Sequence, residues 1–165
     1  MNNLTSYENY FKQIASNYSK LKGFYHVDLF ELVSFLNDLR AGKFKTPLLV
    51  VESYDTNTSA NGNYNIHDIQ HGAILIIGSF DIKNLNPEKK TLFLTEMEEI
   101  TKQVRNKMIL DKRSANCSVM KGLIVDSISI SRTETIAGNF QGYRMEFVIN
   151  AENEISLSND WLNNS

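Results

Sequence analysis

The chain has 165 residues, of which 17 are basic and 19 acidic, so its formal net charge is −2. This length suits one domain around one core. The balanced charge argues against a protein that holds nucleic acid through many phosphate contacts, because such proteins concentrate basic residues on one face. The single cysteine, Cys117, excludes an intrachain disulfide and fits a reducing compartment. No apolar stretch is long enough to cross a bilayer, so we predict no membrane partner.

The first predicted element is a helix that begins at Thr5. Thr5 and Glu8 have the spacing of a capping box, and Gly23 can end the helix in a left-handed conformation. The apolar stripe of this helix is rich in tyrosine and comprises Tyr7, Tyr10, Phe11, Ile14, Tyr18 and Leu21. Because buried tyrosine hydroxyls need a partner, we expect residues 1–23 to form a peripheral helix or to pack on a neighbouring subunit.

A second helix is predicted between the N-cap residue Asp28 and Gly42. Its expected core stripe has helical spacing, with Phe30 and Phe35 at the margins; the stripe is Leu29, Leu32, Val33, Leu36 and Leu39. The segment Leu48–Val51 is then apolar at every position, which indicates a strand covered on both faces.

From Asp55 to Gln70 the chain is polar, and we interpret this segment as a long functional loop around the turn dipeptide at 61–62. The apolar run Ala73–Ile77 predicts the next strand, extended through Phe80 and Ile82. A third helix begins at Asn86-Pro87, because proline favours the first helical position. Its core face is Phe93, Met97, Ile100, Val104 and Met108.

The last predicted elements are two alternating strands, which start at Leu123 and Tyr143 and flank a turn at 138–142. Such alternation is typical of an antiparallel pair with one covered and one polar face. Residues 151–165 form a polar tail that contains the only tryptophan, Trp161. A Trp-Leu pair at this place docks either on its own sheet or on a partner.

The predicted fold is therefore α+β in the order α-α-β-β-α-β-β. It consists of a single, mainly antiparallel four-stranded sheet, with helices packed chiefly on one face, and residues 1–165 form one domain. The expected core is Leu32, Leu36, Leu49, Val51, Leu75, Ile77, Met97, Ile100, Val104, Phe147 and Ile149.

Reactive side chains are sparse. His67 and His71 are four residues apart, but they lie between a loop and a strand, where this spacing has no geometric meaning, and no third zinc ligand is evident. The acidic group around Glu98 reads as a helix surface, with Lys102 placed for an ordinary pair. No nucleophile–base pair or phosphate-binding glycine pattern is visible. We therefore predict no enzyme activity, no metal and no cofactor.

The function is predicted to reside in surfaces. The candidate interface residues come from the polar loop, the polar strand face and the tail: Asp55, Asn61, Tyr64, His67, His71, Arg132, Arg144, Glu146 and Trp161.

Element order and local texture give the chain a resemblance to a known family. A buried strand that ends in Glu-Ser-Tyr-Asp at 52–55, a helix with Met-Glu-Glu-Ile at 97–100 and a closing strand with Gly-Tyr-Arg-Met-Glu-Phe at 142–147 resemble phage tail-terminator and tail-completion (neck) proteins. The likeness covers most of the chain, from Leu29 to Trp161.

This resemblance implies a structural protein without catalytic residues. It implies a homo-oligomeric ring, usually of six subunits, that caps the tail tube and joins it to the neck or connector, with DNA passing through the lumen without specific binding. The localisation that it implies is the virion, after assembly in the host cytoplasm. Two alternatives stay open: a ligand-binding or enzymatic α+β domain with its pocket beneath the 55–70 segment, and a monomeric adaptor.

Overall fold

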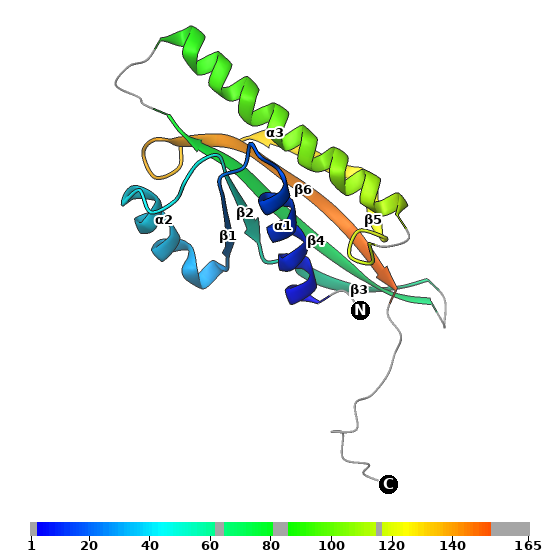
Figure 1. The fold of residues 1–165 in the computed structure, drawn as a ribbon. Helices are drawn as coiled ribbons and strands as arrows, with labels where there is room; N and C mark the ends of the chain where they lie inside the picture. The colour runs from blue at the N-terminus through cyan, green and yellow to red at the C-terminus, as the bar shows by residue number, and fades with distance from the viewer. Residues whose placement is uncertain (1–2, 62–64, 81–85, 115–116, 153–165) are drawn as a thin grey trace.

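The computed structural model describes residues 3–61, 65–80, 86–114 and 117–152 (Figure 1). The elements follow in the order α1 (Leu4–Asn17), β1 (Gly23–Val27), η1 (Leu29–Glu31), α2 (Leu32–Arg40), β2 (Leu48–Glu52), β3 (Asp55–Asn61), β4 (Asn65–Ser79), α3 (Pro87–Arg113), β5 (Leu123–Arg132) and β6 (Phe140–Glu152). The predicted α+β class is confirmed. No helix among these residues is long and apolar enough to cross a membrane.

The sheet differs from the predicted four-stranded one. It is a mixed six-stranded sheet with the strand order β1-β2-β4-β6-β5, and β3 pairs with β4 beside that path. The pair β1–β2 is parallel, and the other pairs are antiparallel. Two strands were not predicted, β1 and β3; at β1, Gly23 opens a strand instead of closing a helix. Its aromatic and β-branched residues, Phe24, Tyr25 and Val27, suit a strand.

Most of the predicted 55–70 loop is a hairpin. β2 and β3 pair in succession with the same side of β4. Val51 pairs with Ile74 and Asp55 pairs with His71, so the segment that joins β2 to β3 contains one residue more than the facing segment of β4. The hairpin and the end of β6, where Glu152 pairs with His67, extend past α1 (Figure 1). We call this extension the arm. Its polar side chains are compatible with strands because both faces of the arm can meet water.

One face of the sheet is covered by α1 and α3, so the expectation that residues 1–23 form a peripheral helix is wrong (Figure 1). Tyr7 and Phe11 are 1% and 0% exposed and pack their rings against Phe147. Tyrosine is tolerated here because its ring supplies apolar contact area. The helix is capped by Asn3, whose side chain accepts from the Ser6 amide at 2.8 Å, instead of by the predicted capping box.

The other face carries α2 only near β1 and β2, so the helices are divided between the faces. Phe35 stacks on Tyr25 with ring centroids 4.8 Å apart, and Leu39 is fully buried beside them. Leu36 and Leu75 are only half-buried in this cluster. Leu32, which was predicted to be core, is exposed because α2 is rotated so that Phe35 faces the sheet.

The α3 prediction is confirmed. Asn86 caps the helix by accepting from the Glu88 amide at 2.9 Å, and Met97, Ile100, Val104 and Met108 are buried. The predicted turn at 138–142 is partly wrong, because β6 already begins at Phe140. A side chain at Gly142 would place its Cβ 1.8 Å from the Ile76 carbonyl oxygen, so glycine is required by strand packing. Strand β4 ends at Ser79, and Ile82 lies outside the described residues.

Candidate functional site

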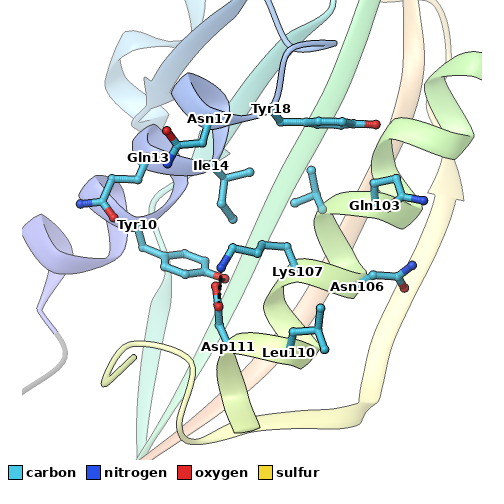
Figure 2. A pocket seen from close by; sticks show the side chains of 11 residues that line it. Tyr10, Gln13, Ile14, Asn17, Tyr18, Gln103, Asn106, Lys107, Leu110 and Asp111 are labelled. Carbon is cyan, nitrogen blue, oxygen red and sulfur yellow. Dashed lines mark hydrogen bonds and ion pairs between the residues drawn. The ribbon is translucent and has the colours of Figure 1, made fainter. Parts of the chain in front are cut away.

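A groove of about 380 Å³ lies between α1 and α3 (Figure 2). Its floor is apolar, because Ile14 and Val104 are buried there. Leu110 borders the groove and is 62% exposed, which is unusual for a leucine beside a core. Amphipathic spacing explains this arrangement. Each of α1 and α3 has an apolar stripe that faces the sheet, and the residues at the edges of the two stripes face each other across the groove.

The charges in the groove are internally paired. The Tyr10 hydroxyl donates to Asp111 Oδ2 at 2.9 Å, and Lys107 pairs with the same carboxylate (Figure 2). Burial and the bond to Asp111 together raise the pKa of Tyr10 far above its ordinary value. The phenol therefore stays neutral and acts as a donor.

Four carboxamides form the rim of the groove: Gln13 and Asn17 on α1, and Gln103 and Asn106 on α3 (Figure 2). Each carboxamide can donate and accept hydrogen bonds. An apolar floor with a carboxamide rim suits an extended peptide segment, whose backbone presents both donors and acceptors.

A second constellation joins three distant segments. His26 Nε2 on β1 lies 3.1 Å from the Ser53 hydroxyl, and His26 Nδ1 lies 3.9 Å from Glu8 Oε2 on α1. The sequence analysis identified no nucleophile–base pair, and the structure shows a contact between the Ser53 hydroxyl and His26 that it did not predict. It was missed because β1 was not predicted, and without β1 nothing brings His26 to Ser53.

This constellation lacks parts that acyl transfer uses. The Ser53 amide donates to the Val27 carbonyl at 3.3 Å, so it is engaged in the backbone instead of pointing at an oxyanion. The His26–Glu8 separation exceeds hydrogen-bond length. The arrangement can link α1 to the bend after β2.

The sheet face that carries α2 is uncovered beyond that helix. Four of the predicted interface residues lie on this uncovered part: Asp55, His71, Arg144 and Glu146. Arg144 makes a two-pronged contact with Glu52, at 2.8 Å for each nitrogen, and also pairs with Glu146. The contact with Glu52 raises the pKa of Arg144. Asp55 and His71 are cross-strand neighbours in the β3–β4 register and lie on the same face of the sheet. Since Arg144 is already paired, its ability to bind an acidic partner is reduced.

The remaining candidates do not form one site. Arg132 is exposed beside Thr133 and Gln141 on the face opposite Arg144, and Asn61 and His67 belong to the arm. Tyr64 and Trp161 lie outside the described residues. Within the described ranges, no group of three or more His, Cys, Asp or Glu side chains is placed to hold a metal ion.

Exposed apolar side chains gather at both ends of the strand order. Beside β1, Phe30 is 93%, Val33 71% and Leu32 43% exposed; we call these three residues the α2 patch. On the edge strand β5, Ile124 and Val125 are exposed; we call them the β5 patch. The sequence pattern placed Leu32 and Val33 in the core because it cannot tell a surface apolar stripe from a buried one.

Comparison of the chain with protein-family models, with curated proteins and with solved structures gives no match.

Proposed function

We propose that the protein is a structural subunit of a closed homo-oligomeric ring. The observation that carries this proposal is the pair of apolar patches at opposite ends of one sheet. Exposed apolar clusters of this kind mark interaction surfaces, and burying them against each other would remove apolar area from water.

The arrangement of the patches favours a head-to-tail contact. A two-fold dimer needs only one self-complementary patch, whereas a ring subunit needs two different surfaces that meet on neighbouring copies. The α2 patch and the β5 patch differ in position and in local structure, since one is helical and the other lies on a strand edge. Such a contact repeats until the rotation closes.

We further propose that this ring ends a phage tail tube and joins it to the neck, within the virion. The support is the resemblance of the chain to tail-terminator and tail-completion proteins, together with the arm, which reaches beyond the helices (Figure 1). The net charge of −2 suits a ring whose lumen passes DNA without binding it specifically. A ring of six subunits and contacts to tube and connector proteins belong to the same proposal.

Native mass spectrometry of two patch variants tests the ring. Phe30→Ser/Val33→Ser disables the α2 patch, and Ile124→Ser/Val125→Ser disables the β5 patch. We expect the unmodified chain to form one closed oligomer and each variant alone to be monomeric. A mixture of the two variants should give dimers and nothing larger, because one intact α2 patch can meet one intact β5 patch.

The matched control is Leu92→Ser, which changes an equally exposed leucine outside both patches and should leave the ring intact. A β5-patch variant that still dimerises by itself would reveal a two-fold contact through the α2 patch and contradict the ring. An unmodified chain that stays monomeric at its highest soluble concentration would do so as well.

The pair of Ser53 and His26 favours a second candidate, a serine hydrolase. A fluorophosphonate probe tests this function directly. Labelling of Ser53 that is lost in His26→Ala would support the hydrolase. We expect no labelling, because the Ser53 amide is held by Val27 and Glu8 is too far from His26 to orient its ring.

A further inference from the structure

We propose that the groove between α1 and α3 binds residues 153–165 of a second copy, with the indole of Trp161 on the apolar floor. This inference rests on the proposed function, since it needs a neighbouring copy. It adds a contact that neither apolar patch supplies.

The groove offers the chemistry that such a segment needs. Ile14 and Val104 form a floor for one large apolar side chain, and Leu110 extends that surface outward (Figure 2). On the α3 rim, Gln103 donates to Glu99 and Asn106 accepts from Arg105, which leaves the Gln103 carbonyl oxygen and the Asn106 amide hydrogens for the backbone of an extended chain. Gln13 and Asn17 offer carboxamides on the α1 rim. A volume of about 380 Å³ falls within the range of side-chain and small-ligand pockets.

Electrostatics favour a neutral side chain on the floor of the groove. The charged side chains that line the groove, Lys107 and Asp111, pair with each other, and Tyr10 also donates to Asp111 (Figure 2). A charged ligand would have to break this pairing and lose its own hydration. An aromatic side chain on the floor avoids both costs.

Residues 153–165 contain such a side chain. Trp161 and Leu162 are adjacent; Asp160 precedes them, and Asn163, Asn164 and Ser165 follow. The Asp160 carboxylate has to stay in solvent while the indole enters the groove, because burying an unpaired charge is costly. Tryptophan is a frequent interface anchor, because it buries a large area with few torsions to order. An extended chain covers up to about 30 Å between Glu152, where β6 ends, and Trp161.

The direction of β6 favours a second copy over the same chain. β6 and α3 run the same way and end at the same side of the molecule (Figure 1). Lys112 near the end of α3 donates to the Leu123 carbonyl, and Leu123 pairs with Ile149 near the end of β6. The end of β6 therefore points away from the groove of its own subunit, which favours the groove of a neighbouring copy.

Trp161 is the only tryptophan, so intrinsic fluorescence of the full chain reports its environment directly. The experiment records the emission maximum and acrylamide quenching over a dilution series, with the mass of the oligomer measured in the same samples. We expect short-wavelength, protected emission in the assembled protein. On dilution, the emission should shift to that of an exposed indole.

Leu110→Gln and Leu92→Gln form a matched pair on α3. Both leucines are exposed, at 62% and 70%, but only Leu110 borders the groove. We expect Leu110→Gln to abolish the short-wavelength emission and Leu92→Gln to preserve it. Urea unfolding curves for both variants should match that of the unmodified chain, since neither side chain is buried.

Three outcomes would overturn the inference. Exposed emission in samples that contain the ring would reject the groove contact while leaving the ring intact. Protected emission that persists when dilution gives monomers would assign the segment to its own chain. Protected emission that Leu110→Gln does not change would place Trp161 elsewhere. Failure of the ring itself is recognised separately, from the measured mass.

Discussion

Helices α3 and α2 were predicted by the same rule, with opposite results. On α3 the residues at helical spacing, such as Ile100 and Val104, are buried as expected. On α2 the expected stripe through Leu32 and Val33 faces solvent, and Phe35 packs on the sheet instead. On α3 the predicted stripe faces the core although Leu92 and Leu110 outside it are exposed, whereas α2 turns part of its predicted stripe to solvent.

The difference lies in the polar residues. Glutamate, lysine and arginine separate the apolar residues on the other faces of α3, where Leu92 and Leu110 are exposed, so one orientation buries the most apolar area. In the sequence 32–40, apolar residues lie on more than one face, and the contact with Tyr25 and Phe44 decides which face turns inward. Both aromatics lie outside α2, so its orientation depends on tertiary packing.

The two helices should differ most in the stability that is lost when one of their apolar side chains is replaced by alanine. Ile100→Ala on α3 should lower the free energy of unfolding by about 2–5 kcal/mol, because a fully buried side chain leaves a cavity. Leu32→Ala on α2 should cost less than about 1 kcal/mol, since surface substitutions have small effects. Urea denaturation followed by circular dichroism, in samples dilute enough to be monomeric, measures both. Equal losses would show that Leu32 is buried in the folded protein.

Alkaline pH should weaken the α1/α3 face more than the α2 face. Burial raises the pKa values of Tyr7 and Tyr10, which are neutral in the folded protein. A phenol in the unfolded chain ionises near pH about 10, so above that pH unfolding releases protons and the free energy of unfolding falls.

Urea midpoints between about pH 8 and about pH 11 test this effect across the ordinary phenol pKa. Tyr10→Phe should flatten the decline, and Tyr25→Phe on the α2 side, where burial raises the pKa of a more exposed ring, should flatten it less. The prediction fails if Tyr25→Phe has the larger effect.

The two tyrosines of α1 should also differ at neutral pH. Tyr10→Phe removes the hydrogen bond to Asp111 and should cost about 1 kcal/mol. The Tyr7 hydroxyl is buried beside the Ala73 backbone without a hydrogen bond of good geometry, so Tyr7→Phe should cost less than Tyr10→Phe. Thermal unfolding of the two variants gives the comparison. A large loss for Tyr7→Phe would indicate a partner for its hydroxyl.

A small loss of stability is expected for the ion pair between Arg144 and Glu52, on the part of the sheet face that α2 leaves uncovered. Arg144 and Glu52 are each about one-third exposed, at 33% and 32% of the side chain. Arg144→Met should therefore cost no more than about 1 kcal/mol, because solvent screens the pair. High salt should reduce the difference between the variant and the unmodified chain. A salt-independent loss of several kcal/mol would show that the pair is more deeply buried in solution.

Strong local signals made part of the fold predictable. Asn86-Pro87 marked the start of α3, and the continuous apolar run Leu48–Val51 marked the central strand β2, which is buried on both faces. These signals depend only on neighbouring residues. The parallel partner β1 has five residues and is fixed by its pairing with β2, which no local pattern encodes.

The candidate sites were less predictable than the fold. The groove needs the relative placement of α1 and α3, and the pair of Ser53 and His26 needs β1. Polarity concealed the strand pairing of the arm, because threonine, serine and asparagine are also typical of loops. Of the predicted interface set, Asp55, His71, Arg144 and Glu146 do share a face, since strand alternation and register place them there.

Strand β4 belongs to two environments along its fifteen residues. Around Ile76 it lies between β2 and β6 beneath packed helices, whereas around Asp68 it belongs to the arm. Amide hydrogen exchange should therefore slow progressively from Asn65 towards Ile77, as opening passes from local fraying to global unfolding. The arm can separate while the core stays folded. A neighbouring subunit that held the arm would slow exchange at its tip without changing the rate at Ile76.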